Sequence, residues 1–437
     1  MRSLPPALLA TLLAGPALAQ APAAATSAST SAPGYRPILS MEGGRPALSL
    51  ANGTFTVQPV LRFDVDAGTF FDQATYPGGN PPRFMDTGRA GVPDTPINVR
   101  RARLGLQGTY LQDFTYKFIW EFAPGAGQQI QPKTNSRIYE LQTAWNGLGW
   151  GTVRVGGFTL LHTLEFSTSS FESMMLEKPA IINIATSLSS GSSRLAAGIE
   201  ARGTRWFAAA YATGGLISTL NDGGQRGVVG RAAGLAVDTE NLRLLVGVNG
   251  AAQFHPGFSG GPQSFRLRDY PELRLEPTRL LDTGTIRSDG GHAIGPEVSG
   301  MIGPVHFTAE AQFVALEGLS GSPNRNFSGY YVGASVPLLG GQRRYDRDTA
   351  TWTRPGFESL DPHSGHWGFA ELAGRYSHVS LNDGTVRGGR QSIFSAALNY
   401  YPNSRIRISA QYSAGNVLLD VRNRDFQALA VRLGFAL

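Results

Sequence analysis

Hydrophobic and polar residues alternate along much of the chain, and segment 391–412 (QSIFSAALNYYPNSRIRISAQY) shows the pattern well. Its apolar positions fall on every second residue, in two runs: Phe394, Ala396, Leu398 and Tyr400, then Ile406, Ile408, Ala410 and Tyr412. Successive side chains of a β-strand point to opposite faces. The pattern therefore predicts two strands joined by a turn at residues 402–404. Each strand has one apolar and one polar face.

The same alternation recurs in segments of about ten residues, the length with which a strand crosses a membrane. Further examples are 54–68, 113–123, 305–315, 367–379 and 429–437. Segment 113–123 places five aromatic residues on one face: Phe114, Tyr116, Phe118, Trp120 and Phe122. These segments predict a large β-sheet with one apolar face.

A sheet built from roughly 400 residues has to curl or close, and closure removes the free strand edges. Few amphipathic helices are available to cover either face. The simplest arrangement places the apolar face against lipid and the polar face around water. We therefore predict an all-β fold, a transmembrane antiparallel β-barrel of 16 strands, although 14 or 18 strands fit the length almost as well. Barrels of this size leave an aqueous channel.

The N-terminal part of the chain differs from the rest. Residues 1–19 combine Arg2, an apolar core at residues 8–13 and the small-residue sequence Ala-Leu-Ala at residues 17–19, which predicts a cleaved secretory signal peptide. Residues 20–40 are rich in Ala, Ser and Thr and predict a disordered linker. Residues 41–437 are then one barrel domain.

Composition narrows the classes of function. The 437 residues include 55 Gly and 27 Pro, only 16% are charged, and there is no Cys. The lack of Cys removes thiolate catalysis and zinc–thiolate sites. No apolar run reaches the roughly 18 residues of a membrane helix. A closed barrel also spans a membrane, with a much weaker apolar signal.

Positive charge is carried almost entirely by arginine. Lys and Arg together number 38 against 32 acidic residues, and only Lys117, Lys133 and Lys178 are lysines. Cationic side chains in a water-filled tube concentrate anions, and guanidinium groups match phosphate and carboxylate geometry. The candidate pore-lining and anion-binding residues are Arg62, Arg101, Arg103, Lys117, Arg154, Lys178, Arg202, Arg274, Arg375, Arg407 and Arg432.

Carboxylates occupy the same polar faces and leave a second interpretation open. Examples are Asp64, Asp66, Glu121, Glu140, Glu200 and Glu371. Glu272, Arg274 and Glu276 are expected at alternate positions of one strand, where they would neutralise one another. On this interpretation the arginines form a structural ladder of ion pairs, and the net selectivity is undecided.

One segment is too long for a turn and too apolar for a solvated loop. Residues Phe158 to Ser193 read FTLLHTLEFSTSSFESMMLEKPAIINIATSLSSGSS. Loops of this length have a function or are disordered, and the many apolar residues argue against disorder. We predict a constriction loop that folds into the barrel. An extracellular loop contacting a neighbouring subunit is the alternative.

Catalytic and metal-binding patterns are weak. His363 and His366 lie in a Gly/Pro-rich loop, and His162 and Glu165 lie in the predicted constriction loop. All four are explained more simply as loop residues. No nucleophile elbow, zinc-protease helix or phosphate-binding loop occurs. We predict no enzyme activity, no metal and no cofactor. A soluble or membrane β-rich binding protein, or a barrel enzyme, is the alternative to a porin.

Several stretches resemble the phosphate-selective porin O and P family of outer-membrane channels. Segment 367–412 is the clearest, with its Glu-Leu-Ala-Gly-Arg-Tyr-Ser strand, its Gly-Gly-Arg-Gln sequence after a loop and its Asn-Tyr-Tyr strand end. Segments 100–110, 271–284 and 330–347 also resemble the family. The similarity extends from about residue 55 to the end of the chain.

The resemblance implies a 16-stranded barrel in the bacterial outer membrane, assembled as a homotrimer. Each pore would be narrowed by an infolded loop, lined by cationic side chains, and permeable to anions such as phosphate. The expected partners are outer-membrane lipid, lipopolysaccharide, small anions and further copies of the chain, but not nucleic acid. Family members often carry an N-terminal coiled coil, whereas this chain has the Ala/Ser/Thr linker there.

Overall fold

The computed structural model describes residues 37–42, 44–50, 53–72, 97–123, 137–217, 224–257, 263–275, 279–419 and 422–437. The predicted signal peptide and residues 20–36 of the predicted linker lie outside this range. At the end of that linker, Ile38 begins a short hairpin of β1 (Ile38–Glu42) and β2 (Arg45–Leu50). Strand β2 then pairs with the start of the next strand, so the hairpin extends the main sheet.

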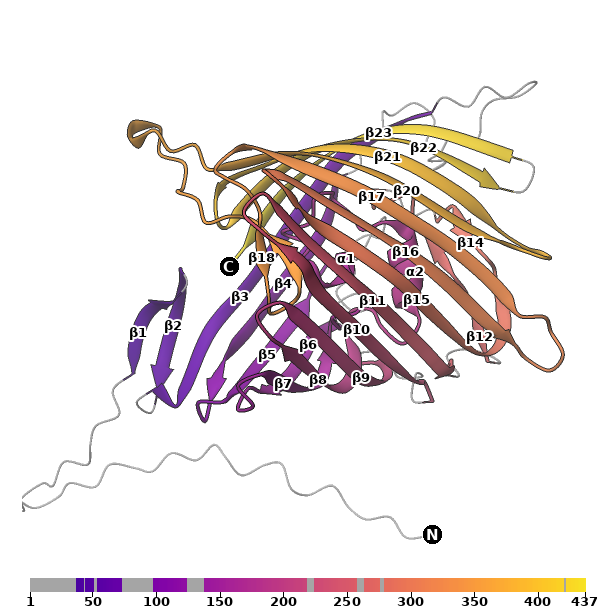
Figure 1. Cartoon of the computed structure of the whole chain (residues 1–437), viewed down its shortest axis with the longest axis horizontal. Coiled ribbons are helices and arrows are strands. Elements are labelled where there is room, and N and C mark those ends of the chain that lie inside the picture. The colour runs from indigo at the N-terminus through magenta and orange to yellow at the C-terminus, as the bar shows by residue number, and fades with distance from the viewer. Residues whose placement is uncertain are drawn as a thin grey trace, which may run out of the picture.

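Sixteen antiparallel strands form a closed barrel (Figure 1). They are β3 (Phe55–Asp72), β4 (Ile97–Tyr110), β5 (Phe114–Glu121), β6 (Arg137–Trp145), β7 (Gly151–Phe158), β8 (Arg194–Arg202), β9 (Trp206–Leu216), β10 (Arg226–Asp238), β11 (Leu242–His255), β15 (Ile286–Ile302), β16 (Val305–Gly318), β17 (Arg325–Leu339), β20 (Phe369–Asp383), β21 (Val386–Asn403), β22 (Ile406–Leu419) and β23 (Arg422–Ala436). Strand β23 pairs with β3 and closes the sheet. The predicted fold class and strand number are confirmed.

The alternation in the sequence corresponds to the two faces of the wall. On β16, Phe313 is 56% exposed, whereas Gln312 beside it is fully buried. On β23, Leu433 is 55% exposed and Arg432 is 1% exposed. The apolar side chains therefore point outward and the polar ones inward, as the pattern predicts. Among the described residues, no helix is long and apolar enough to cross a membrane.

The two ends of the barrel have different connections. At one end, six connections are short: 111–113, 146–150, 203–205, 239–241, 303–304 and 404–405. The C-terminus lies at the same end (Figure 1). The family resemblance described above would make this end the periplasmic one, because bacterial barrels have short periplasmic turns and longer extracellular loops. The exception is segment 340–368 between β17 and β20, which carries the hairpin of β18 (Arg344–Asp346) and β19 (Thr351–Thr353) and the 3-10 turn η2 (Pro362–Ser364).

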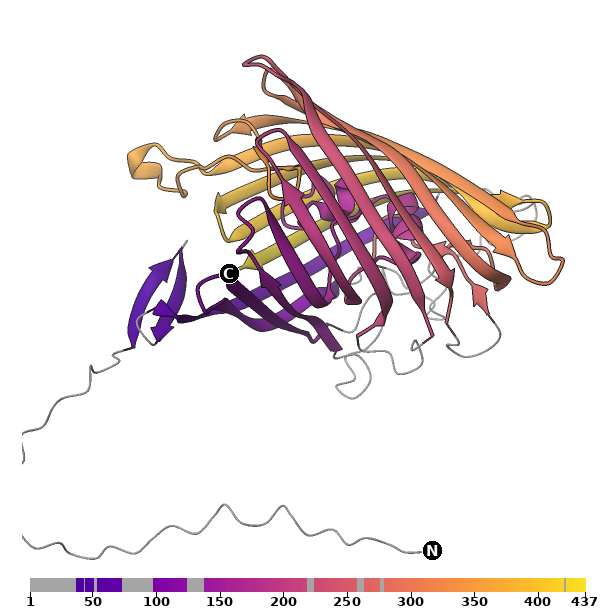
Figure 2. The ribbon, with the colours of Figure 1, turned by 60° about the horizontal axis from the view of Figure 1, so that its bottom comes forward.

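The segment between β7 and β8 folds into the barrel (Figure 2), as predicted for residues 158–193. It carries helices α1 (Leu164–Ser167) and α2 (Ala180–Ser187). Pro179 precedes α2, where its missing N–H costs nothing. The isoleucines of α2 are buried against β15, β16, β17 and β20. Gly329 on β17 allows this packing, since a Cβ there would lie 2.8 Å from Ile181 Cγ1.

A second inward segment connects β11 to β15 and contains β12 (Ser264–Phe265), β13 (Arg268–Asp269) and β14 (Leu281–Asp282). The prediction that Glu272, Arg274 and Glu276 lie on one strand is wrong. Residues 271–275 are an irregular loop in which Glu272 has φ 55°, and Glu276 lies outside the described residues. Leu273 and Leu275 pack against Leu176 of the infolded segment. Glu272 is buried like Leu273 and Leu275, so the alternation there does not correspond to two faces.

Candidate functional site

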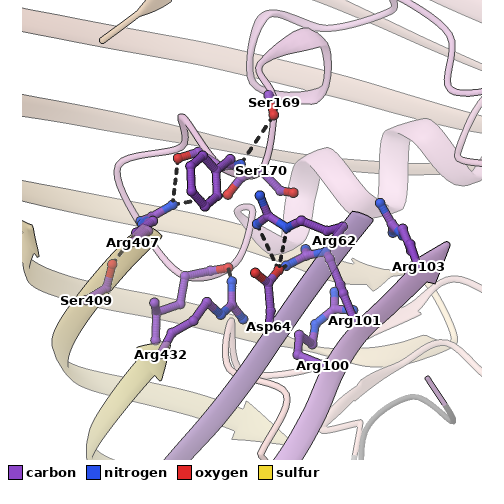
Figure 3. A network of polar contacts seen from close by, with 12 residues as sticks. Arg62, Asp64, Arg100, Arg101, Arg103, Ser169, Ser170, Arg407, Ser409 and Arg432 are labelled. Atoms are coloured by element: carbon purple, nitrogen blue, oxygen red, sulfur yellow. Dashed lines mark hydrogen bonds and ion pairs between the residues drawn. The ribbon is translucent and has the colours of Figure 1, made fainter. Parts of the chain in front are cut away.

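A cavity of about 640 Å³ lies between the inner wall of β3–β6 and the infolded segment. The wall contributes Arg62 from β3 and Arg100, Arg101 and Arg103 from β4. The infolded segment contributes residues 166–173, with the sequence FSTSSFES. Figure 3 shows the arginines of β3 and β4 facing Ser169 and Ser170 of this segment. Arginines and hydroxyl groups thus face each other across the lumen.

The charges around this cavity are strongly unequal. Among the described residues, three side-chain carboxylates line it: Glu140, Glu172 and Glu177. Ten cationic side chains of the same described residues line it: Arg45, Arg62, Arg100, Arg101, Arg103, Lys117, Arg137, Lys178, Arg274 and Arg354. Each of the three carboxylates forms an ion pair with at least one of these cations. The cavity is therefore electropositive.

Ion pairs in the wall hold the arginine row, which consists of Arg62, Arg100, Arg101 and Arg103, in place. Asp64 accepts from Arg62 Nη2 and from Arg101 Nη1, each at 2.8 Å (Figure 3). Arg103 Nε donates to Glu121 at 2.6 Å. Arg62 also lies over the Phe171 ring, with Cζ 4.4 Å from its centroid. These contacts fix the guanidinium groups at the edge of the cavity.

Two β-bulges bring extra side chains into the cavity. In the pairing of β3 with β4, Asp64 faces Arg101 and Val65 faces Val99, so Arg100 is the unpaired residue. In the pairing of β5 with β6, Tyr139 is skipped in the same way. A bulge adds one residue to a strand and redirects a side chain. Arg100 consequently reaches Glu177, and the Tyr139 ring lies 3.5 Å from Arg103 Cζ.

The predicted site residues divide into three groups. Six of them line the main cavity: Arg62, Arg101, Arg103, Lys117, Lys178 and Arg274. Arg154 lines a second cavity beside it, and Arg202 pairs with Asp348 of the 340–368 segment. Arg375, Arg407 and Arg432 lie under the infolded segment and do not line either cavity.

These last three arginines fasten the infolded segment to the wall. Arg375 donates to the Glu177 carbonyl at 2.8 Å, and Arg407 donates to the Ser170 carbonyl at 3.1 Å. Arg432 bridges Asp66 on the wall and Glu177 on the segment, with contacts of 2.7 and 2.8 Å. The sequence predicted correctly that these side chains point inward. It gave no information on which of them the infolded segment covers.

Burial and ion pairs shift the acid–base properties of the infolded segment. Burial opposes the charge of Glu177, but Arg100 and Arg432 outweigh it and hold the pKa of this carboxyl well below its ordinary value. Burial lowers the pKa of Lys178, whose ammonium donates to the carbonyls of Glu165 and Thr168. His162 is fully buried, and burial lowers its pKa to about 3, so its imidazole is neutral at pH 7.

Four cationic residues of the cavity were missed by the sequence analysis: Arg45, Arg100, Arg137 and Arg354. Arg100 falls on the apolar face if alternation is extrapolated, and only its bulge brings it inward. Arg354 comes from the 340–368 segment and pairs with Glu172 at 2.8 Å. The Arg-Arg sequence at 100–101 was a usable signal, since a strand seldom turns an arginine toward lipid.

The second cavity, of about 370 Å³, borders the first and shares Lys117 with it. It lies on the inner wall of β3–β7 toward the short-turn end. Glutamine and threonine dominate its lining: Thr56, Gln58, Gln107, Thr109, Thr115 and Gln142, together with Lys117 and Arg154. In the part of the chain that the structure describes, no carboxylate belongs to this lining.

Comparison with known families identifies the class of protein. The family model described as phosphate-selective porin O and P matches residues 85–437, which is most of the chain. The chain therefore belongs to this family of outer-membrane porins, and it is a non-enzymatic channel. This excludes the alternatives of a soluble binding protein and a barrel enzyme.

Individual relatives are more distant. An uncharacterized protein of Caulobacter vibrioides is 30% identical over 147 residues, which are 34% of this chain and 29% of that protein. The outer-membrane protein OmpT of Vibrio cholerae, with loop L8 deleted, has a similar structure at 10% identity, with a TM-score of 0.53 over 88% of this chain and 100% of that one. An anion-selective porin from Comamonas acidovorans has a TM-score of 0.51 at 13% identity, over 88% and 100% of the two chains. These structural similarities support the fold alone.

Proposed function

We propose that this porin gives passive diffusion of small hydrophilic solutes, with a preference for anions such as phosphate. The observation that carries the proposal is the lining of the main cavity, to which the described residues contribute ten cationic side chains and three side-chain carboxylates. Low-dielectric walls focus the field of such charges into the lumen, where anions accumulate and cations are repelled. Rings of arginine and lysine are the usual basis of anion selectivity in pores.

Two cations near the tip of the infolded segment add to this field. Arg407 donates to neutral acceptors only: the Ser409 hydroxyl, the Asn399 amide oxygen and backbone carbonyls. Lys178 likewise donates to carbonyls. Within the described part of the chain, neither has a carboxylate within 4.0 Å. Their charges are therefore less neutralised than that of Arg432, which has both Asp66 and Glu177.

The opposing wall gives a passing anion further hydrogen bonds. Hydroxyl groups of Ser167, Thr168, Ser169 and Ser170 line the cavity opposite the arginines. The hydroxyls of Ser169 and Ser170 can donate to an anion and can exchange that bond with water, whereas Thr168 Oγ1 already donates to the Leu164 carbonyl and Ser167 Oγ is buried. The arginine row is already engaged with Asp64 and Glu121, which limits its affinity for solutes. An anion would therefore be attracted without being trapped.

Planar-bilayer recording tests the proposal directly. The reversal potential in a KCl gradient should show a chloride permeability several times that of potassium. Arg137→Glu, in the lining of the cavity, should lower this ratio several-fold. Arg390→Glu is the matched control, because Arg390 is exposed on the outer wall and alternates with the buried Gln391. A wild-type channel that favours potassium would overturn the anion preference and leave the porin assignment intact.

We also propose a homotrimer in the outer membrane, surrounded by lipid and lipopolysaccharide. One solved structure of similar fold is described as a trimer form of Vibrio cholerae OmpT, with a TM-score of 0.51. The mass of the detergent-solubilised protein, measured by native mass spectrometry before and after boiling, tests this assembly. Export through a cleaved signal peptide is proposed as well, and N-terminal sequencing of the mature protein should begin at Gln20.

A further inference from the structure

The polar wall beside the arginine row carries a different chemistry. The second cavity presents three glutamine amides and three threonine hydroxyls: Gln58, Gln107, Gln142, Thr56, Thr109 and Thr115. Amides and hydroxyls both donate and accept hydrogen bonds, whereas guanidinium and ammonium groups only donate. This wall therefore suits solute hydroxyl groups, which also do both, better than it suits bare anions.

The glutamines are held in an ordered array. Gln107 Nε2 donates to Gln58 Oε1 at 3.2 Å, and the hydroxyls of Thr56 and Thr109 are 2.9 Å apart. Arg154 Nη1 donates to Gln142 Oε1 at 2.7 Å, while its other nitrogens bind Glu200. Ordered polar groups lose less conformational freedom when they bind a solute than mobile ones do. The array is therefore preorganised for recognition.

Lys117 lies between the arginine row and the glutamine–threonine wall, because it lines both cavities. In the register of β4 with β5 it lies opposite Gln107, and Arg103 lies opposite Glu121. Arg103 and Gln107 are therefore roughly 14 Å apart along β4, at about 3.4 Å per residue. An inorganic anion is too small to contact the arginine row and the amide wall together. A solute with an anionic end and a longer hydroxylated body can contact both.

The dimensions agree with an organic solute. The cavities measure about 640 and 370 Å³. Pockets for small organic molecules measure about 300–1,000 Å³. We propose that the pore is built for polyhydroxylated organic anions, such as sugar phosphates, whose hydroxyl groups contact the glutamine–threonine wall while the anionic group lies at Lys117 and the arginine row. This inference rests on the proposed anion-selective porin function.

The test compares three anions as blockers of single-channel chloride current: glucose 6-phosphate, hexyl phosphate and inorganic phosphate. Hexyl phosphate carries the same anionic group and carbon number without the hydroxyl groups. The half-blocking concentration of glucose 6-phosphate should be at least fivefold lower than those of the other two. The variant Q58M/Q107M/Q142M keeps side-chain length but removes the amides, and it should abolish this difference while chloride selectivity persists. If the triple variant does not fold, Q107M alone should reduce the difference, since Arg154 then keeps its contact with Gln142.

Gln427→Met is the matched control, because Gln427 alternates with the buried Phe426 and binds Tyr412 on the outer wall. It should block like wild type. Equal block by glucose 6-phosphate and hexyl phosphate in wild type would overturn the inference, as would an unchanged preference in the glutamine variants. A cation-selective reversal potential would instead overturn the proposed function. The two failures are thus distinguished by separate measurements.

Discussion

At the scale of single residues, the inward-facing cationic side chains have two distinct environments. Arg103 and Lys117 keep part of their surface in the cavity, with 15% and 34% of the side chain exposed. Arg375 and Arg432 are 2% and 0% exposed and hold carboxylates and carbonyls under the infolded segment. The first environment allows contact with solutes. The second makes the same residue type part of the interior packing.

Arg432→Gln should therefore act on stability. The substitution leaves the buried carboxylates Asp66 and Glu177 without their shared partner. Breaking one side of a buried ion pair costs about 3–5 kcal/mol. Urea unfolding of the protein in lipid vesicles should show a loss of this size. Arg137→Gln, at an exposed position of the cavity, should unfold like wild type. Equal stability of the two variants would contradict the structural role of Arg432.

Asp269 makes a pH-dependent contribution at the inward loop between β11 and β15. Burial raises its pKa from 3.8 to about 6, although Arg274 and its hydrogen bond from Asn183 at 2.7 Å oppose this. The folded state then binds the proton more tightly than the unfolded state. The stability contributed by protonated Asp269 is present at low pH and is lost as pH rises from about 4 to 6. By pH 7 the loss should reach roughly 3 kcal/mol, at 1.36 kcal/mol per pKa unit.

Comparison with Asp269→Asn isolates this contribution. The variant cannot titrate at position 269. The free energy of unfolding of the wild type should therefore fall relative to that of the variant between pH 4 and pH 7. Urea titrations of both proteins at pH 4, 5, 6 and 7 give this difference directly. A difference that stays constant over this range would show that Asp269 titrates normally.

How much of the site the sequence predicted depends on local regularity. Alternation identified Arg62, Arg101 and Arg103 as inward-facing because β3 and β4 are regular at these positions. It missed Arg100 because a bulge reverses the direction of one side chain. Alternation also did not show that the infolded segment covers Arg407 while Arg62 lines the cavity. Such coverage depends on contacts between residues more than 200 positions apart, such as Arg407 with Ser170.

At the scale of elements, the infolded segment is held by the inner wall of the opposite strands. Glu310 on β16 accepts from the backbone N–H groups of Leu164 and Glu165 at 3.0 and 2.7 Å. Gln411 on β22 accepts from Leu176 N, and Glu272 of the inward β11–β15 loop accepts from Ala180 N. The bonds to Leu164, Glu165 and Ala180 satisfy donors at the starts of α1 and α2, which would otherwise be orphaned in the interior. The wall thus positions the segment through its backbone.

Glu310→Ala should loosen this segment. It leaves two buried N–H groups and the Tyr331 hydroxyl without their acceptor, each at about 1–3 kcal/mol. We expect larger fluctuations of single-channel current and faster proteolysis within residues 159–193 in detergent. Glu317→Ala on the same strand is the control, because its side chain is 60% exposed. Wild-type current noise and proteolysis in the Glu310 variant would show that these bonds do not hold the segment.

The elements were predictable to different degrees. The infolded segment was predictable from its length and from apolar residues such as Phe171 and Met175, which are buried inside the barrel. The inward hairpin β18–β19 carried no such signal. It is held by Arg231 on β10, which donates to the carbonyls of Thr349 and Ala350 at 2.6 and 2.8 Å. Backbone carbonyls are present at every position, so the sequence does not reveal which of them a distant arginine binds.

At the scale of the whole molecule, closure of the sheet gives one continuous apolar surface outside and one polar lumen inside. The pairing of β23 with β3 places Arg432 opposite Asp66, so the first and last barrel strands share a buried ion pair. Outward positions carry large apolar residues all around, for example Leu104, Phe313, Leu398 and Leu433. This surface is what a bilayer requires, since lipid offers no hydrogen bonds to polar side chains.

Two arginine substitutions test whether the outer surface of the barrel is embedded in lipid. Leu398 on β21 is 46% exposed on the outer wall, whereas Leu111 is 68% exposed in a short turn at the end of the barrel. Arginine on the lipid face costs about 2–4 kcal/mol at the bilayer midplane and about 0–1 kcal/mol near its edges. Leu398→Arg should therefore lose about 2–4 kcal/mol in urea titrations of folding into vesicles, and Leu111→Arg should lose little. Equal behaviour of the two variants in vesicles would mean that the outer wall at Leu398 is not embedded in hydrocarbon.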